Sequence, residues 1–427
     1  MTIPSRLCLS LAAVCTIPVS SVESGDWPGW RGEFRDDVSI ESGLLKEWPP
    51  GGPQKLWTFK EAGSGYSSFA VVGESLFTVG ADKFSDRLMS VNVTTGMKQW
   101  SVPLGERWEN RWGDGPRSTP TVSGDRVVAL GGRGNLACVS TTDGQVLWTV
   151  AMTNIGGQIP NWGYSESALI DEGRVIVTPG NDRGTMAAFD LKSGELLWQS
   201  AEIVQPAHYS SVIVAVHNGQ RQYIQLGPEA LFAVRASDGS LLWETKWPGK
   251  IAVIPTPIFH GGRVYVSAGY GVGSMLAEIG VDNEVSVLYH NKVMKNRNGG
   301  VIRIGDHVYG YSEGPGWVCQ ELETGEMVWN QKRILGRGTV SCADGMLYCL
   351  EEESGICALV RATPKGWEEH GRVTIDPQTE HRSSDGRIWS HPVIANGRLY
   401  LRDQEIICCY EISDSRQASA EAVVSER

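Results

Sequence analysis

Hydrophobic runs long enough to cross a membrane are missing from this sequence of 427 residues. A membrane-spanning helix needs about 20 consecutive apolar residues, and the longest apolar stretch, from Leu7 to Val19, is too short. Arg6 precedes this stretch, and Ser21 and Ser24 follow it as small residues suitable for cleavage. We therefore predict a signal peptide at residues 1–24, a periplasmic or extracellular location and no transmembrane segment.

Positive charge is also scarce. The 38 Lys and Arg residues are outnumbered by 49 Asp and Glu residues, so the formal net charge is -11. An acidic surface repels the phosphate backbone of nucleic acids. We therefore expect no nucleic acid as a partner.

Cysteines are few, and those after residue 24 are odd in number, at positions 138, 319, 342, 349, 357, 408 and 409. An odd number rules out complete internal pairing. Cys408 and Cys409 are adjacent in a predicted strand, where consecutive side chains point to opposite faces. We interpret them as two packed thiols, with a disulfide between neighbours as the alternative.

Glycine and tryptophan, in contrast, are abundant, with 51 and 16 residues. They recur in a short phrase, seen in "TTDGQVLW", "LKSGELLW" and "ASDGSLLW", in which a Trp follows a Gly by four positions. The Gly supplies the positive φ of a tight turn, and the apolar residues on both sides alternate as in strands. Each phrase therefore predicts a β-hairpin.

The phrase repeats at intervals of 38 to 50 residues, a period that suits four short strands and their turns. A weaker copy has Asn283 in place of the Gly and Tyr289 in place of the Trp. The repeat tryptophans are Trp57, Trp100, Trp148, Trp198, Trp243, Trp329 and Trp367. Together with Tyr289 they mark eight units.

A second pattern supports this count. Six residues before the turn Gly, or at the aligned place, every unit has a small residue: Ser90, Cys138, Ala188, Ala233, Ala277, Cys319, Ala358 and Cys409. A position restricted to small residues indicates a strand packed tightly against its neighbours.

The two ends of the repeat region complement each other. The Trp57 strand has no unit before it, and the last small-residue strand, residues 405–412, has no Trp strand after it. Pairing them closes a ring without exposed strand edges. The prediction is an all-β, eight-bladed β-propeller of four-stranded antiparallel blades.

The domain boundaries follow from this ring. Residues 54–412 form the propeller, and residues 413–427 are expected to be a disordered tail. Residues 25–53 form a lead-in rich in Trp, Pro and Gly. We expect it to bury its tryptophans on the ring, with Arg31 and Arg35 reaching acids on the blades. The alternative is an arm that docks a partner.

The repeats resemble the pyrroloquinoline-quinone (PQQ) type propeller repeat over roughly residues 54–412. The opening "GDWPGWRGEFRDDVSIESGLLKEWP" resembles the lead-in of secreted bacterial PQQ-like proteins, often named polyvinyl-alcohol dehydrogenases by similarity alone. The resemblance implies the fold. It implies activity less strongly, because both quinoprotein alcohol dehydrogenases and non-catalytic scaffolds such as the outer-membrane assembly lipoprotein have this propeller.

Residues directly before the first strand of each unit approach each other at one mouth of the ring. The mouth is expected to bind a ligand through Arg117, Tyr164, Glu166, His208, Tyr209, Arg297, Asn298, Arg337, Trp389 and His391, with Tyr66 and Trp162 beside them.

Three of these residues are arginines, which attract carboxylate or phosphate groups through paired hydrogen bonds. We therefore expect a secreted, monomeric binding or scaffold module that accepts an anionic small molecule or a protein or peptide partner. The alternative is that each arginine pairs with a local acid, such as Asp114 or Glu313.

The resemblance implies a second function, a PQQ- and Ca²⁺-dependent alcohol dehydrogenase. Under this hypothesis Glu166 and Asn298 hold Ca²⁺, Arg337 polarises the quinone and Trp389 stacks on it. No Asp stands at an obvious mouth position, and repeats this short leave no room for the long insertions that bury the cofactor in true dehydrogenases. We therefore favour the scaffold, with no cofactor.

Other motifs of catalysis are weak. "GYGVG" at residues 269–273 resembles a nucleotide-binding loop, but no helix follows it, so we interpret it as a turn between two strands. No Ser-His-Asp arrangement and no pair of histidines at metal-binding spacing stands out. Catalytic residues therefore stay unknown.

Overall fold

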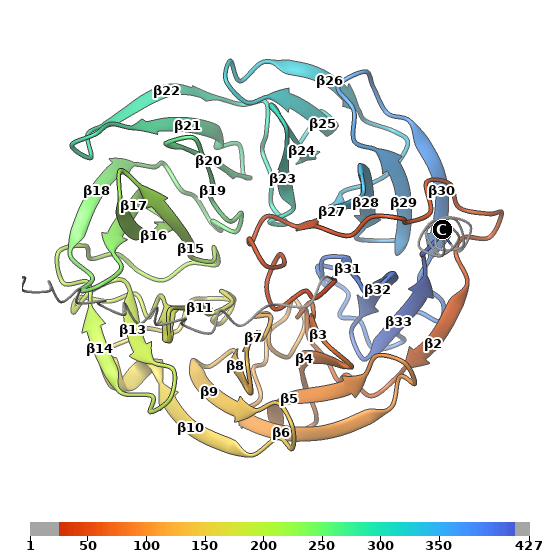
Figure 1. Ribbon diagram of the computed structural model, residues 1–427, viewed down its shortest axis with the longest axis horizontal. Coiled ribbons are helices and arrows are strands. Elements are labelled where there is room, and N and C mark those ends of the chain that lie inside the picture. Colours follow the sequence, from red (N-terminus) through yellow and green to blue (C-terminus); the bar gives the residue numbers. More distant parts are fainter. Residues whose placement is uncertain (1–24, 415–427) are drawn as a thin grey trace, which may run out of the picture.

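The strands of the chain form eight sheets arranged as blades around a central axis (Figure 1). The structure is a computed structural model and describes residues 25–414. The predicted eight-bladed, all-β propeller is confirmed. The predicted signal peptide, residues 1–24, and the predicted tail from residue 415 onward lie outside the described residues.

Each blade contains four antiparallel strands, and its first strand lies nearest the axis. Blade 1 comprises β3 (Ala70–Val72), β4 (Ser75–Ala81), β5 (Ser85–Asn92) and β6 (Lys98–Glu106). Blade 2 comprises β7 (Thr121–Ser123), β8 (Arg126–Leu130), β9 (Asn135–Ser140) and β10 (Val146–Ala151). Blade 3 comprises β11 (Leu169–Asp171), β12 (Arg174–Val177), β13 (Ala187–Asp190) and β14 (Leu196–Gln199). Blade 4 comprises β15 (Ile213–His217), β16 (Gln220–Leu226), β17 (Ala230–Arg235) and β18 (Leu241–Lys246).

The second half of the ring repeats this plan. Blade 5 comprises β19 (Ile258–His260), β20 (Arg263–Ala268), β21 (Gly273–Ile279) and β22 (Val285–Asn291). Blade 6 comprises β23 (Val301–Ile304), β24 (His307–Ser312), β25 (Gly316–Glu321) and β26 (Met327–Gln331). Blade 7 comprises β27 (Gly338–Ala343), β28 (Met346–Glu351), β29 (Ile356–Arg361) and β30 (Glu369–Thr374). Blade 8 comprises β31 (Val393–Ala395), β32 (Arg398–Asp403), β33 (Ile406–Glu411) and β2 (Lys55–Phe59).

Blade 8 joins the two ends of the propeller. β2 pairs antiparallel with β33, and Trp57 lies opposite Cys409. This pairing is the predicted ring closure, and it supplies the fourth strand that blade 8 would otherwise lack. Figure 1 shows β2 at the rim beside β33, next to the start of blade 1.

The recurring Gly and Trp form a contact between neighbouring blades. Trp57 of blade 8 packs on Gly96 of blade 1 so closely that an added Cβ would lie 2.7 Å from the indole ring. The Trp57 Nε1 donates a hydrogen bond to the carbonyl of Val93, three residues before that Gly (2.8 Å). Trp100, Trp148, Trp198 and Tyr289 each repeat both contacts on the next blade.

Three tryptophans depart from this pattern. Trp329 donates to the carbonyl of Thr363 in blade 7 (2.9 Å) but packs on no turn Gly there. Trp243 is buried but donates to Gln222 of its own blade (2.7 Å). The prediction that Trp367 belongs to the strand repeat is wrong, because Trp367 lies before β30 and Arg372 takes the place opposite Ala358. The connection between β29 and β30 is longer than that between β5 and β6, and it therefore leaves the Trp outside the strand.

The predicted small residue is present in the third strand of every blade, with one shift in pairing register. In blade 5 the partner of Tyr289 is Leu276, while Ala277 lies opposite Val287. All seven cysteines of the described residues are free and buried, which agrees with packed thiols at Cys408 and Cys409. Burial raises the pKa of both thiols.

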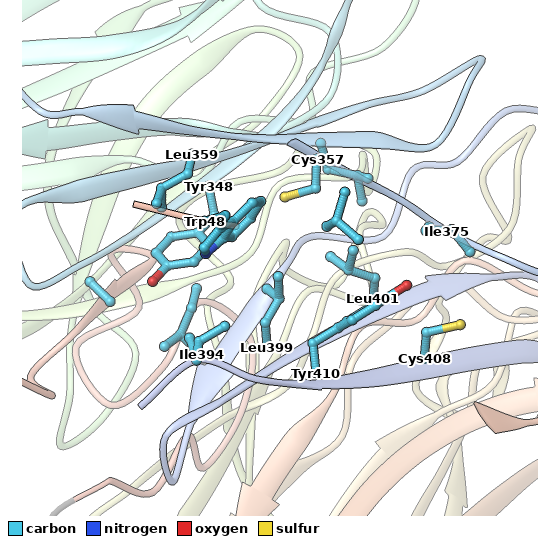
Figure 2. Close-up of a cluster of buried hydrophobic side chains, with 14 of the residues drawn as sticks. Trp48, Tyr348, Cys357, Leu359, Ile375, Ile394, Leu399, Leu401, Cys408 and Tyr410 are labelled. Atoms are coloured by element: carbon cyan, nitrogen blue, oxygen red, sulfur yellow. The ribbon is translucent and has the colours of Figure 1, made fainter. Parts of the chain in front are cut away.

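The lead-in replaces the missing contact between blades 7 and 8. Trp48 packs there in a cluster with Tyr348, Leu359, Leu399 and Tyr410 (Figure 2). Its ring centroid lies 5.9 Å from that of Tyr348. A tryptophan from outside the repeats thus fills the junction at which Trp367 does not dock.

The lead-in also occupies the central channel. β1 (Val38–Ser39) pairs in parallel with β27, and Trp27 pairs with Val71 of β3. Gly73, in the turn after β3, donates to Asp26, so the lead-in enters from the face that has the turns between first and second strands. Figure 1 shows this segment crossing to the axis.

Across residues 25–414, no helix is long and apolar enough to cross a membrane. The helical content of this part is one 3₁₀ turn, η1 (Met152–Ile155).

The docking contact predicts unequal effects of two tryptophan substitutions. Trp198 is 9% exposed and bonded to the next blade, so Trp198→Ala should lower the free energy of unfolding by about 3–5 kcal/mol. Trp367→Ala should cost less than half of that, because this ring lies outside the strand. Urea midpoints of the two variants provide the measurement. Equal losses would contradict the role assigned to the docking contact.

Candidate functional site

A cavity of about 320 Å³ lies at the axial mouth formed by the loops before the first strands. Aromatic rings dominate its wall. It is lined by Trp30, Tyr66, Trp112, Arg117, Trp162, Ser165, Tyr209, Ile251, Ala252, Ile254, Tyr270, Arg297, Asn298, Arg337, Glu352 and Trp389.

Six of the ten predicted site residues line this cavity, together with Tyr66 and Trp162. The six are Arg117, Tyr209, Arg297, Asn298, Arg337 and Trp389. The other four, Tyr164, Glu166, His208 and His391, are not among the lining residues. The side chains of these four residues contact partners inside the protein instead.

The four residues outside the lining have internal partners. The Tyr164 hydroxyl donates to the carbonyl of Pro179 (2.9 Å), and His208 Nδ1 accepts from the amide of Val253 (3.2 Å). Burial lowers the pKa of His208 to about 4, so this imidazole is neutral at pH 7. These side chains support the loops of the mouth.

Glu352 is the main lining residue that the sequence reasoning missed. Its carboxylate accepts hydrogen bonds from Asn298 Nδ2 (2.7 Å), Arg337 Nε (2.6 Å) and Trp389 Nε1 (3.0 Å). These partners come from the loops that enter blades 6, 7 and 8. One buried carboxylate therefore joins three predicted site residues from three blades.

The Glu352 carboxylate also stabilises the charged form of Arg337. Burial lowers the pKa of Arg337, but the hydrogen bonds and the charge of Glu352 outweigh burial, and the pKa is raised overall. Arg337 is therefore a permanent cation that is already neutralised. It is not free to hold an external anion.

The three predicted arginines differ in their pairing. Arg297 forms an ion pair with Glu313, which is the pairing with a local acid that the sequence left as an alternative. Its guanidinium also lies over the Tyr270 ring, 4.3 Å from the centroid. Arg117 forms no ion pair with any residue in 25–414. Its guanidinium donates to the carbonyls of Gly113 (2.8 Å) and Gly115 and lies 5.3 Å from the Tyr66 ring centroid.

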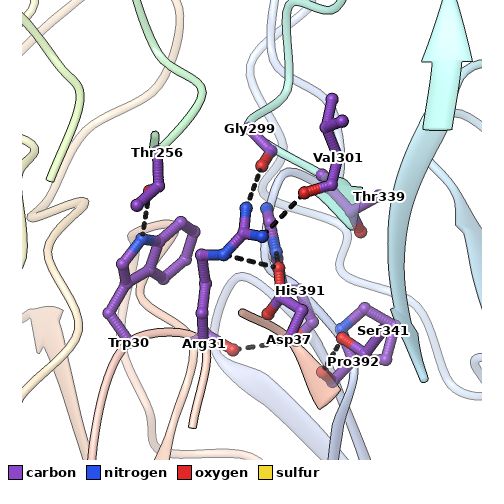
Figure 3. Close-up of polar contacts among 12 residues, drawn as sticks. Trp30, Arg31, Asp37, Thr256, Gly299, Val301, Thr339, Ser341, His391 and Pro392 are labelled. Atoms are coloured by element: carbon purple, nitrogen blue, oxygen red, sulfur yellow. Dashed lines mark hydrogen bonds and ion pairs between the residues drawn. The ribbon is translucent and has the colours of Figure 1, made fainter. Parts of the chain in front are cut away.

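We call Trp30, the lining residue that the lead-in contributes, the floor of the cavity; Figure 3 shows its contact with Thr256. Its Nε1 donates to Thr256 Oγ1 (3.0 Å), and its ring contacts the His391 ring in a tilted arrangement, with centroids 4.4 Å apart. His391 in turn contacts Asp37 through Nδ1 and the carbonyl of Asn298 through Nε2, both at 3.0 Å. The floor is thus bonded to blades 5, 6 and 8.

The arginines of the lead-in do not reach acids on the blades, contrary to the expectation. Arg31 pairs with Asp37 of the lead-in itself (3.2 Å) and donates to the carbonyls of Gly299 and Val301 (2.7 Å each). Arg35 donates to the carbonyl of Ser167 (2.7 Å). The exposed edges of the inner strands offer carbonyls rather than carboxylates, and the arginines bind those.

Three of the lining residues that the sequence reasoning missed, Trp30, Tyr270 and Glu352, come from outside the loops that enter the first strands. Trp30 comes from the lead-in, and Glu352 and Tyr270 come from turns between second and third strands. Those turns lie at the same end of a blade as the loop that enters its first strand, because the strands are antiparallel. Topology could therefore have pointed to Glu352 and Tyr270, whereas no local signal marks Trp30.

Comparison with known proteins identifies the family of this chain. Residues 85–331 match a family model of PQQ-type repeats described as outer membrane protein assembly factor BamB. The chain belongs to this BamB-type family.

Individual relatives in sequence are partial matches. BamB of Moranella endobia is 26% identical over 157 residues, which are 36% of this chain and 35% of that protein. An uncharacterised protein of Rickettsia conorii is 27% identical over 123 residues, 26% of this chain and 28% of that protein. The chain spans about a third of the length of the curated relatives it matches.

Solved structures share the fold over more of the chain. BamB from Moraxella catarrhalis superposes with a TM-score of 0.60 and 15% identity, covering 84% of this chain and 100% of that one. Quinohemoprotein alcohol dehydrogenase from Comamonas testosteroni superposes with a TM-score of 0.62 and 9% identity, covering 92% and 82%. At these identities the likeness shows the fold alone.

The cavity of this BamB-type propeller does not fit the PQQ and Ca²⁺ roles that the dehydrogenase hypothesis assigns. Glu166, one proposed ligand, is not part of the lining, and its Oε1 accepts from the amide of Thr178. The carboxylate that does line the cavity, Glu352, is surrounded by N–H donors and the Arg337 cation. Ca²⁺ requires 6 to 8 oxygen ligands, and a neighbouring guanidinium repels it.

Glu166 has a different property, which follows from its burial. Burial raises the pKa of this carboxyl to about 7, although the hydrogen bond from Thr178 and the charge of Arg35 oppose the rise. Its Oε2 is buried and has no hydrogen-bond partner among the described residues. The carboxyl is therefore protonated at mildly acidic pH.

We expect removal of the Glu352 carboxylate to destabilise the mouth. Glu352→Ala leaves the Arg337 cation without its anion and two N–H groups without an acceptor, at a cost of about 2 kcal/mol or more in the free energy of unfolding. Glu353→Ala is the matched control, since it breaks only a surface pair with Arg387 and should cost less than about 1 kcal/mol. Chemical denaturation of both variants tests this; equal costs would contradict it.

The raised pKa of Glu166 leads us to expect that the stability of the protein depends on pH. Between its unfolded pKa of 4.5 and its folded pKa of about 7, the folded state binds more protons than the unfolded state. The contribution of Glu166 to stability therefore falls as pH rises through this window. In Glu166→Gln, the decrease in melting temperature from pH 5 to pH 8 should be smaller than in wild type. Glu195→Gln, in an exposed turn, should leave the decrease unchanged.

Proposed function

We propose that this chain is an exported BamB-type scaffold that binds a protein partner through its axial cavity. The observation that carries the proposal is a cavity lined by seven aromatic side chains with one arginine, Arg117, that has no acid partner in residues 25–414. Aromatic residues and arginine dominate the binding energy of protein interfaces. The proposed partner therefore presents an apolar group next to a negative charge.

The size of the cavity supports a peptide segment as the ligand. Ligand cavities typically measure about 300–1,000 Å³, and about 320 Å³ lies at the low end. Such a volume accommodates a large side chain of a partner. The rest of the partner would contact the loops around the mouth.

The proposed location follows from the relatives and the sequence. The relatives named BamB are described as outer membrane assembly factors. The predicted signal peptide at residues 1–24 fits export to the same compartment. We therefore propose a periplasmic protein associated with a partner at the outer membrane.

The proposal predicts which substitutions abolish peptide binding. A peptide library with free C-termini, selected on the full chain, should yield peptides with an apolar residue next to a carboxylate, either of a side chain or of the C-terminus. Ser165→Trp, which fills the cavity, and Arg117→Ala should each weaken binding of the selected peptides by about tenfold or more. Arg303→Ala, in β23, is the matched control and should bind as wild type, because the Arg303 side chain donates to the carbonyl of Gly305 and does not line the cavity.

Two outcomes would count against this proposal. Peptides that bind Ser165→Trp as tightly as wild type would remove the cavity as the binding site. Stoichiometric binding of PQQ in the presence of Ca²⁺, followed by its absorbance, with alcohol-dependent reduction of an artificial acceptor, would favour the dehydrogenase instead.

A further inference from the structure

We propose that the cavity receives the carboxyl terminus of the partner chain, with the last side chain among the aromatic rings and the terminal carboxylate on Arg117. This inference rests on the proposed function, since it names the part of the partner that the same cavity binds.

The first observation is that the cavity is a dead end. The lead-in crosses the channel, and its Trp30 is held at the floor by the bond to Thr256 and the tilted ring contact with His391. Beneath it, Arg31 joins the lead-in to the carbonyls of Gly299 and Val301 (Figure 3). A segment that enters the mouth must therefore stop inside or turn back.

The small volume favours a chain terminus over a segment that turns back. If the carboxylate belonged to an internal Asp or Glu, the backbone would have to enter and leave through the mouth. The apolar side chain would then come from a second residue, which needs further room. A chain terminus brings one stretch, and its apolar side chain and carboxylate share one Cα. About 320 Å³ fits that single residue.

The second observation is the state of Arg117. Two backbone carbonyls, of Gly113 and Gly115, fix its guanidinium, which has five N–H donors in total. Burial lowers the pKa of Arg117, and the nearby acids Asp86 and Asp114 only partly oppose this. A bound carboxylate would stabilise the cation with two parallel hydrogen bonds.

The aromatic rings lie close to this arginine. Tyr66 lies under the Arg117 guanidinium and 4.8 Å from the Trp389 ring. On the other side, Tyr209 lies 5.3 Å from Trp162. An apolar side chain among these rings therefore has its own backbone within reach of Arg117.

The third observation is backbone strain at the edge of the cavity. Ile251 is 62% exposed and has φ 49°, and Tyr270 has φ 57°. A β-branched residue in the left-handed region is a true outlier, and such strain gathers at binding sites. Ile251 thus offers an exposed apolar contact to the residue that precedes the partner's terminus.

The test uses peptides tethered by their N-termini, with random sequences and free C-termini, on the full chain. The tightest binder is then compared as the free acid, as the C-terminal amide, and with Gly-Ser added after its last residue. We expect the amide and the extended peptide to bind at least about tenfold more weakly than the acid. These comparisons use the wild-type protein and do not depend on the folding of a variant.

Arg117→Gln provides the matching change on the protein. It should weaken the acid by about tenfold and leave the amide unchanged, while Arg303→Gln should affect neither. Equal affinity of acid and amide for the wild type would overturn the terminal-carboxylate inference but leave the proposed function standing. Failure of all peptides to distinguish wild type from Ser165→Trp would overturn both.

Discussion

The docking of one blade's tryptophan on the next blade's glycine is the interaction on which the ring depends. The turn needs positive φ, as at Gly96 with 68°, and the absence of a side chain there lets the Trp57 ring lie against the backbone. The indole N–H then binds a carbonyl of the same turn. This single contact thus gives a turn carbonyl its hydrogen bond, buries an aromatic ring and sets the spacing between blades.

The ring is regular where this contact repeats and irregular where it fails. Blade 7 offers Arg372 instead of a docked tryptophan, and Trp48 of the lead-in fills the junction from outside the repeat. The same lead-in continues into the channel and places Trp30 beneath the mouth. A single segment therefore completes the propeller and gives the cavity its floor, so the stability of the ring and the shape of the site are linked.

Electrostatics distinguish the groups that build the mouth from the group that can bind. Buried cations are costly unless paired, and Arg337 and Arg297 have their carboxylates in Glu352 and Glu313. Each pair joins two loops of one blade, blade 7 for Arg337 with Glu352 and blade 6 for Arg297 with Glu313, and holds the wall in place. Arg117 is fixed only by backbone carbonyls. It is the cation that an external carboxylate would neutralise.

The sequence alone determined the propeller, the number of blades and the closing strand, because these depend on local signals that repeat: a turn glycine, an aromatic residue and a small residue at constant spacing. It also placed Arg117, Arg337 and Trp389 at the mouth, since topology assigns the loops. Only the tertiary structure decided that Glu352 binds Asn298 and Trp389 and that Trp30 forms the floor of the cavity. Those contacts join residues from separate blades and from the lead-in, and no local pattern encodes which of them meet.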